Sequence, residues 1–357
     1  MAMKIGRVRQ ANQHISRPTF DDPTAVVHWF GAVQAQDYLG GLWAVGLRTR
    51  GATEASVEAA IARRVIVRTW PMRGTLHFVA AEDVRWILPL LTPRVITATT
   101  SRYRSLELTD AVFTRAAKVA EKALEGGKAI RRDALYELWS AHGIATRDSR
   151  GLHLLGHLSQ NGLLCFGARD GKQQTFTLLE EWVPTMKTYA RDEALGELAL
   201  RYFTSHGPAS VHDFAWWAGL TITESRAAVE SVSSRLESET VDGRTLWFAG
   251  GQSARPTRTA HLLPAWDEFT VAYRDRNDIL DPAYAKRVNA GGGVLKPVIV
   301  VDGQVLGTWQ RRLGKKGMTV SETYFAKRNR PSVAAIASAK KRYAAFLGVG
   351  IDESSRE

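Results

Sequence analysis

The feature that most constrains the fold is an order of elements that occurs twice, in which three helices are followed by two short strands. In the first clear copy, helical periodicity and strand patterns cover residues 110–124, 130–142, 148–161, 163–167 and 174–178. Gly171 lies between the two strands and predicts the turn that reverses the chain. Three helices closed by a hairpin form the outline of a winged helix, whose third helix can enter a DNA groove.

The second copy follows directly. Helices are predicted at 194–204, 210–219 and 223–236, and the strands lie near 239–241 and 245–248. Asp242-Gly243 separates these strands and is a strong signal for a two-residue hairpin turn. The second copy is therefore also expected to end in a wing.

A looser copy precedes both of these. Its helices are predicted at 22–32 and 55–63, and its strands at 65–70 and 75–79. Taken together, the three copies predict three tandem winged-helix units in the first 250 residues or so. Arrays of this kind usually bind duplex DNA, although winged helices also bind proteins.

The remainder of the chain has a different character. Residues 297–301 and 304–309 alternate around the turn Asp302-Gly303, the strand pattern continues past Gly314 to 319–321, and a helix is predicted at 332–346. The fold class is therefore α+β, with three winged-helix units and a small C-terminal β-rich domain. The predicted domains are residues 1–108, 109–190, 191–254 and 255–351, followed by a disordered tail at 352–357.

The charge of the chain favours a polyanionic partner. The 357 residues have a formal net charge of +12, and each Lys or Arg that neutralises a phosphate releases condensed counterions. Nucleic acid is favoured over an anionic membrane, because no polybasic run adjoins a long amphipathic anchor. The N-terminus lacks the apolar segment of a signal peptide, so a cytoplasmic protein is expected. Cys165 is the single cysteine, which excludes an intramolecular disulfide, and its apolar neighbours predict a buried strand.

Gln34 and Gln36 are the most unusual pair of candidate site residues. In an extended segment residues two apart share a face, whereas in a helix they point in nearly opposite directions. Because Gly40-Gly41 is expected to end any helix soon afterwards, we expect both carboxamides to project together. Such a pair can hold one water or one sugar-phosphate edge. The alternative is that one glutamine caps the helix end while the other is solvated.

Two basic hairpins are candidate DNA contacts. In the segment 68–77 we expect Arg68, Arg73 and His77 to contact DNA and Trp70 to pack in the core. The second hairpin tip carries four cations, which either contact phosphates or form an ordinary solvated turn. These cations are Arg311, Arg312, Lys315 and Lys316.

Several kinds of catalytic site are absent from the sequence. It has no Gly-x-Ser-x-Gly elbow, no phosphate-binding loop ending in Gly-Lys-Ser/Thr and no dinucleotide fingerprint after a strand. His153 and His157 have a spacing that metals use but lack the adjacent glutamate of a zinc hydrolase, so no metal is predicted. Asp267 and Glu268 are either a catalytic carboxylate pair or, more commonly, partners of a nearby arginine such as Arg274 or Arg276.

Four motifs in order along the chain resemble one known family. They are Gln34-Ala35-Gln36, the segment 68–77, the segment 262–276 beginning Leu-Leu-Pro-Ala-Trp-Asp-Glu-Phe, and Val300-Val301-Asp302-Gly303 with Gly307-Thr308-Trp309. The sequence resembles the AlkZ-like winged-helix DNA glycosylases of bacteria, in the subgroup with a Gln-aliphatic-Gln motif. The resemblance covers nearly the whole chain.

The resemblance implies hydrolysis of the N-glycosidic bond of alkylated bases in duplex DNA, including N7-alkylpurines and interstrand crosslinks. It assigns catalysis to Gln34 and Gln36, with Asp37 in support. It also implies a monofunctional, monomeric enzyme that needs neither a metal nor an organic cofactor, and that serves base excision repair or self-resistance to a genotoxin. The alternatives from other classes are a non-catalytic winged-helix DNA-binding regulator and a toxin-sequestering resistance protein.

Overall fold

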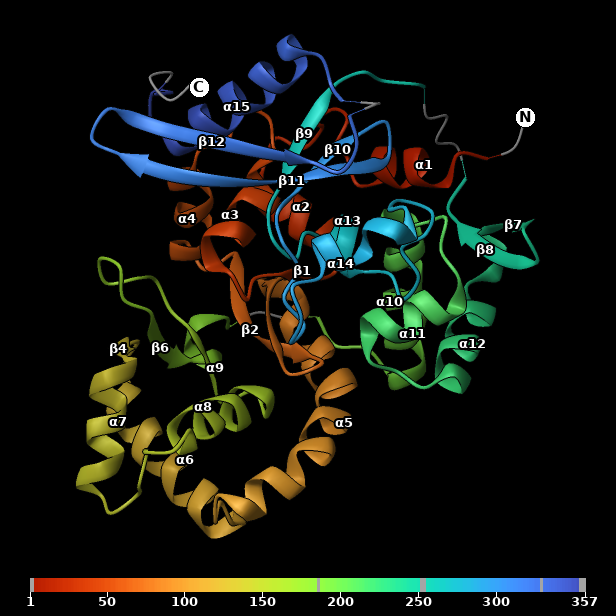
Figure 1. Ribbon diagram of the computed structural model, residues 1–357. Helices are drawn as coiled ribbons and strands as arrows, with labels where there is room; N and C mark the ends of the chain where they lie inside the picture. The colour runs from red at the N-terminus through yellow and green to blue at the C-terminus, as the bar shows by residue number, and fades with distance from the viewer. Residues whose placement is uncertain (1–2, 185–186, 251–254, 328–329, 353–357) are drawn as a thin grey trace. The chain divides into compact units, whose positions relative to one another are not determined.

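The computed structural model describes residues 3–184, 187–250, 255–327 and 330–352 (Figure 1). The predicted tail therefore lies outside the described residues, apart from Asp352. Helices and sheets are mixed along the chain, in agreement with the predicted α+β class. No helix within the described ranges combines the length and apolar character that a membrane crossing requires.

The chain forms two compact units. The first comprises Met1–Val57 and Leu195–Glu357, and the second comprises Glu58–Ala194. The boundary falls inside α4 (Glu54–Ala62). This division differs from the predicted domains, because the chain leaves the first unit after Val57 and returns to it at Leu195, so that the predicted domain 1–108 has parts in both units.

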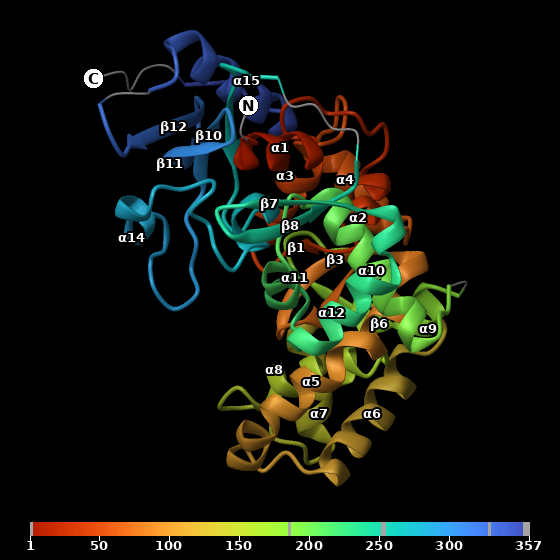
Figure 2. The same ribbon diagram turned by 90° about the vertical axis from the view of Figure 1, so that its right-hand side faces the viewer.

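The second unit contains the first clear copy of the predicted pattern. Its helices are α5 (Val84–Ser105), α6 (Asp110–Leu124), α7 (Arg132–Ala141), α8 (Arg150–Gln160) and α9 (Leu179–Trp182), and its strands are β2 (Ile66–Met72), β3 (Thr75–Ala80), β4 (Ile130–Arg131), β5 (Leu164–Phe166) and β6 (Thr175–Leu178). The five strands are antiparallel neighbours in the order β3-β2-β5-β6-β4. Figure 2 shows α6, α7 and α8 grouped together, as expected of the three helices in one unit.

Apolar side chains of these helices and strands form one core. Thr109 caps α6 by accepting a hydrogen bond from the Val112 N–H. Trp70 is buried, and its ring is tilted against Phe166 at 5.1 Å and stacked on Phe176 at 6.5 Å, which confirms that Trp70 packs in the core. Cys165 is buried on β5, as predicted, and burial raises the pKa of its thiol.

The longest helix of this unit has no counterpart among the predicted elements. α5 contains Pro89 and Pro93, and each proline removes one helical N–H donor. One face of α5 nevertheless packs on β2 and α8, and burial of that face stabilises the helix despite the missing donors.

The first unit contains two sheets and a set of covering helices. Its helices are α1 (Ile5–Asn12), α2 (Pro23–Phe30), α3 (Tyr38–Gly46), α10 (Arg191–Ser205, which begins in the second unit), α11 (Val211–Ala218), α12 (Ile222–Ser231), α13 (Glu268–Val271), α14 (Ala285–Val288) and α15 (Val333–Leu347). Its strands are β1 (Val33–Gln34), β7 (Glu237–Val241), β8 (Arg244–Phe248), β9 (Ala260–Leu263), β10 (Val298–Val301), β11 (Gln304–Gly314) and β12 (Gly317–Tyr324). The larger sheet has the order β12-β11-β10-β9, and α15 packs beside β9 (Figure 1).

Both predicted two-residue turns are confirmed. Asp242-Gly243 joins β7 to β8, and Asp302-Gly303 joins β10 to β11. Each of these four residues has a positive φ, between 49° and 78°. Positive φ at both central positions matches the right-handed twist of the flanking strands, and Asp-Gly favours this conformation.

The expected helix break at Gly40-Gly41 is wrong. Both glycines lie inside α3, and both are buried. A Cβ at Gly40 would lie 2.6 Å from Asp37 Oδ2, so the glycine allows the Asp37 carboxylate to fold over the first turn. The helix therefore uses glycine for close packing rather than for termination.

We expect His261 to make the stability of the protein depend on pH. Its ring lies on β9 and is buried, and its Nδ1 accepts a hydrogen bond from the Arg342 guanidinium at 2.9 Å. Burial, followed by the charges of Arg342 and Arg48, lowers the pKa of His261 to about 3. The unfolded chain, with a histidine pKa of about 6.5, binds a proton that the folded chain does not. The contribution of His261 is therefore present above about pH 6.5 and is lost as the pH falls toward 3.

We expect the His261→Gln variant to lose part of this acid sensitivity. Between about pH 7.5 and pH 5.5 its free energy of unfolding should fall by roughly 1.4 kcal/mol less than that of the unaltered protein. Urea titrations followed by tryptophan fluorescence at the two pH values measure the difference. His142→Gln, at an exposed histidine, should keep the full pH dependence. An unchanged pH dependence in His261→Gln would contradict the assignment.

Candidate active site

Gln34 lies on β1, where the predicted extended backbone is found. Its side chain is only 5% exposed, and its Oε1 accepts a hydrogen bond from the Gln36 N–H at 2.6 Å. Because a backbone N–H only donates, the atom that faces it is the oxygen, and the NH2 group of Gln34 points the other way. Within the described residues this NH2 group has no hydrogen-bond partner. Two donors are therefore available to a ligand.

Gln36 differs from Gln34 in its environment. Gln36 is exposed and follows β1 in an irregular segment, so the two glutamines are not an equivalent pair. Asp37 is exposed as well, and it precedes α3 without capping the helix through its side chain. The segment thus presents one buried amide whose orientation is set by the backbone, one accessible amide and one accessible carboxylate.

A buried carboxylate holds the backbone of this segment in place. Glu268, at the start of α13, is 1% exposed, and its Oε1 accepts the Gln34 N–H at 2.8 Å. Its Oε2 accepts a hydrogen bond from Trp217 Nε1 at 2.9 Å and lies 3.2 Å from His206 Nε2. Burial lowers the pKa of His206, an effect that Glu268 opposes. Since a carboxylate accepts, His206 donates through Nε2. Glu268 therefore ties Gln34 to α11 and to the end of α10.

Asp267 forms a separate buried ion pair. Its two oxygens lie 2.8 and 2.9 Å from the two terminal nitrogens of Arg48, in a bidentate arrangement. Arg48 also donates to the backbone carbonyls of Gln13 and Ala44. The prediction that Asp267 pairs with an arginine is confirmed, but the arginine is Arg48 and not Arg274 or Arg276. The pairing joins residues 219 apart in sequence, and local spacing does not reveal such a pair.

The predicted DNA contacts of the second unit are mostly buried. Arg68 is 5% exposed, lies 4.6 Å from the Phe166 ring centre and donates to Gln174 Oε1 at 3.1 Å. His77 is 0% exposed, and its Nδ1 faces the Thr75 carbonyl. Arg73 is half-buried and has a φ of 53° in the turn of the hairpin. Arg68 and His77 are engaged by contacts within the protein, so in this hairpin we retain only Arg73 as a proposed DNA contact.

The basic hairpin of the first unit is exposed at its tip. Arg312, Lys315 and Lys316 are exposed, and the two lysines form the turn between β11 and β12. Arg311 is half-buried, and its guanidinium donates to the Tyr343 hydroxyl at 2.6 Å. Three of the four predicted cations are thus available to a polyanion, while Arg311 also fastens the hairpin to α15.

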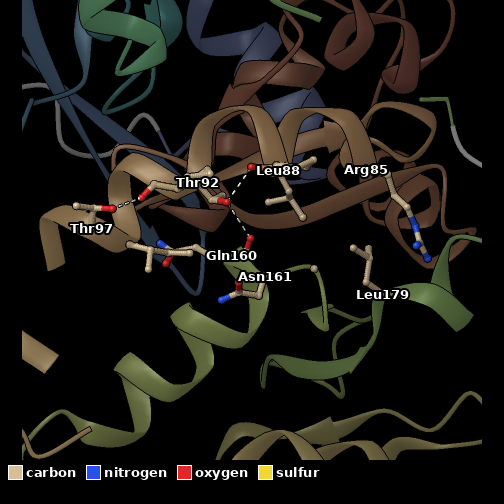
Figure 3. A pocket seen from close by; sticks show the side chains of 11 residues that line it. Arg85, Leu88, Thr92, Thr97, Gln160, Asn161 and Leu179 are labelled. Atoms are coloured by element: carbon tan, nitrogen blue, oxygen red, sulfur yellow. Dashed lines mark hydrogen bonds between the residues drawn. The ribbon is translucent and has the colours of Figure 1, made fainter. Parts of the chain in front are cut away.

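The second unit contains a cavity of about 570 Å³ between α5 and the end of α8 (Figure 3). Thr92 Oγ1 lies 2.8 Å from Leu88 O and 2.9 Å from Gln160 O, and so joins the two helices. Arg85 is the charged residue of the cavity lining, and the residues that line the cavity include none of the predicted site residues. We assign this cavity no part in the reaction.

Comparison with known proteins decides the family. The model of the family described as DNA glycosylase AlkZ-like matches residues 27–346. The chain belongs to the AlkZ-like DNA glycosylase family. A curated relative, the "Interstrand DNA cross-link repair glycosylase" of Streptomyces sahachiroi, is 25% identical over 333 residues and matches 85% of each chain. The solved structure of Streptomyces sahachiroi DNA glycosylase AlkZ has the same fold, with a TM-score of 0.82, 24% identity and 98% coverage of both chains.

In this AlkZ-like glycosylase chain, three of the four resemblance motifs meet inside the first unit. The carbonyls of Leu262 and Leu263 accept hydrogen bonds from Trp43 Nε1 at 2.7 Å and Trp309 Nε1 at 2.8 Å. Glu268, five residues further along, holds Gln34. The motif 262–269 is therefore a buried frame around the glutamine segment. The adjacent carboxylates in an apolar sequence indicated a special role, but His206 and Trp217 carried no signal that linked them to Glu268.

Proposed function

We propose that this chain is a monofunctional DNA glycosylase that hydrolyses the N-glycosidic bond of N7-alkylpurine nucleotides, including crosslinked ones, in duplex DNA. Membership of the AlkZ-like family carries the proposal. The curated relative is named a crosslink repair glycosylase, and the net charge of +12 suits a DNA partner. The proposed setting is base excision repair or genotoxin self-resistance, carried out by a monomer in the cytoplasm.

The proposed chemistry needs no strong base. An N7-alkylated purine is cationic, so it leaves as a neutral base when the C1′–N bond breaks, and the sugar acquires oxocarbenium character. Water then adds to C1′ and its released proton passes to solvent. The protein must place that water and stabilise developing charge. In our proposal Gln34 donates a hydrogen bond to the water through its NH2 group, Gln36 accepts a hydrogen bond from the water through its carbonyl oxygen, and Asp37 stabilises the cationic sugar.

The helix and hairpin units supply the proposed DNA-binding surface. The elements α6-β4-α7-α8-β5-β6 and α10-α11-α12-β7-β8 follow one another in the order of a winged helix. We propose that these two, with the looser unit that precedes them, form three winged helices. Arg73, Arg312, Lys315 and Lys316 are the proposed phosphate contacts, joined by the half-buried Arg311.

Base release from a defined duplex tests the proposed function. The substrate carries one N7-methylguanine, and the products are resolved by liquid chromatography. The wild-type protein should release free 7-methylguanine and leave an intact strand with an abasic site. Trapping of a covalent protein–DNA adduct by borohydride would contradict direct hydrolysis, because it reports a Schiff base. Absence of base release across a panel of N7- and N3-alkylated duplexes would contradict the glycosylase assignment.

We expect the Glu268→Gln variant to slow base release by roughly tenfold without weakening DNA binding. The amide replaces one carboxylate oxygen by a donor, so either the Gln34 N–H or the Trp217–His206 pair loses its acceptor, and Gln34 is held less firmly. Single-turnover rates at saturating enzyme measure the first effect and fluorescence anisotropy the second. Glu224→Gln, at the helix cap of α12, is the matched control. Equal losses in both variants would indicate a general loss of stability instead.

A further inference from the structure

The first unit contains a cavity of about 620 Å³ whose lining residues take no part in the proposed reaction. It lies where the N-terminus of α11, the side of α12, the β7–β8 hairpin and the segment after α13 meet. We call it the α11–α12 cavity. Its lining is Ser210, Val211, His212, Asp213, Arg226, Gly243, Arg244, Thr245, Trp247, Arg274 and Asp275. Three of these residues are arginines, which come from α12, β8 and the segment after α13.

Two of these arginines are available to an anion. Arg226 on α12 and Arg274 after α13 are exposed, and within the described residues neither has a carboxylate partner. Arg244 is held in place, because its guanidinium pairs with Asp278 at 2.8 and 3.1 Å. Asp275 lies 3.9 Å from Arg244 and offsets part of its charge. The lining therefore carries three guanidinium groups against the two carboxylates of Asp213 and Asp275, and two of those guanidinium groups have no carboxylate partner in the described part of the chain.

The backbone at the start of α11 adds donors to the same cavity. The Val211 and His212 N–H groups occupy the first helical turn, where no intrahelical acceptor exists, and they have no other acceptor among the described residues. The nearby Asp213 carboxylate already accepts four hydrogen bonds, from Ser210 N and Oγ and from the backbone N–H groups of Arg274 and Asp275. A helix N-terminus with free N–H groups and adjacent arginines favours a phosphate.

Trp247 favours a nucleotide over a free anion. Its ring is half-buried in the cavity lining on β8, and its backbone is fixed by reciprocal hydrogen bonds to Ala209 at 2.8 and 3.0 Å. An aromatic wall beside phosphate donors is the arrangement that binds a base or sugar together with its phosphodiester.

We propose that the α11–α12 cavity binds the phosphodiester backbone of a DNA strand, through Arg226, Arg274 and the N-terminus of α11, with Trp247 against the adjoining nucleotide. This inference rests on the proposed function, since it names a second contact with the same DNA. The contact holds the strand without touching the reacting sugar. Its loss weakens binding and leaves the rate of base release at saturation unchanged.

Salt-dependent binding of an undamaged duplex tests the inference. Fluorescence anisotropy of a fluorescein-labelled duplex is measured over a range of salt concentrations for the wild type and for Arg226→Gln plus Arg274→Gln. The double variant should bind on the order of tenfold more weakly per lost contact near 0.1 M salt, and its slope of log K against log salt should be shallower by about two. Arg17→Gln plus Lys341→Gln removes the same charge from two exposed positions and should leave the slope nearly unchanged.

Two further experiments test whether the cavity binds DNA or a free anion, and whether the contact affects binding or the rate of base release. Inorganic phosphate at constant ionic strength should not displace the duplex, and displacement would show a free-anion site and overturn the inference. Single-turnover base release at saturating double variant should stay within about threefold of wild type, because the reacting sugar is untouched.

The outcomes distinguish the two proposals. This inference alone would be overturned if the double variant kept the wild-type slope of log K against log salt. It would also be overturned if the charge-matched control lost as much slope as the double variant. A wild-type protein that binds no DNA would overturn both the inference and the proposed function. Base release that is absent while the double variant still shows the shallower slope would overturn the glycosylase proposal and support the DNA contact.

Discussion

Replacing Gln34 and Gln36 together by alanine should lower base release from an N7-methylguanine duplex by roughly 10²- to 10³-fold. This is the loss typical when preorganised donors at a reacting centre are removed. Both amides take part in placing the attacking water in the proposed mechanism, so neither side chain replaces the other. The measurement is a single-turnover time course at saturating enzyme.

The two single variants should differ, because the two glutamines differ in environment. Gln34 is buried, and its carbonyl accepts the Gln36 N–H. Gln34→Ala therefore removes both the proposed catalytic amide and the acceptor of the Gln36 N–H, whereas Gln36→Ala removes an exposed amide. Gln310→Ala, at an exposed glutamine on β11, should keep wild-type activity. Base release that survives the double change would remove the catalytic assignment of both residues.

Replacing Asp267 by alanine should destabilise the first unit by about 3–5 kcal/mol. The reason is that Arg48, which is 1% exposed, would keep a buried charge without its partner. Asp267 also caps α13 by accepting the Phe269 N–H at 2.9 Å, so the variant loses that contact too. Urea denaturation followed by circular dichroism measures the loss.

A double replacement separates the cost of the unpaired charge from the loss of packing. Arg48→Met plus Asp267→Leu removes both charges, and we expect it to be less destabilised than Asp267→Ala alone. Asp21→Ala breaks the exposed pair with Arg50 and should cause almost no change, because exposed pairs contribute little. Greater destabilisation in the double variant than in Asp267→Ala would show that packing, and not charge, explains the loss.

Local patterns predicted the elements that lie within a few residues of their own signals. α6 begins and ends at the predicted residues, and both Asp-Gly turns are where the sequence placed them. Helical periodicity and turn residues depend only on residues that are close in sequence, so a single sequence is enough to detect these signals. Two helices that are stabilised mainly by packing were not predicted. They are α3, which contains two internal glycines, and α5, which contains two prolines.

The candidate site likewise combines features that residues close in sequence indicate with features that depend on contacts between distant residues. The amino-acid sequence shows which groups the candidate site can use: two neutral amides two residues apart, a basic chain and an adjacent pair of carboxylates in an apolar segment. The tertiary structure alone decided which of these groups are accessible and what holds them. It buried His77 and Arg68, paired Asp267 with Arg48 and brought Glu268 to the backbone of Gln34 across 234 positions. Burial and hydrogen bonding over such separations arise from the packing of whole elements, and no local pattern of residues encodes them.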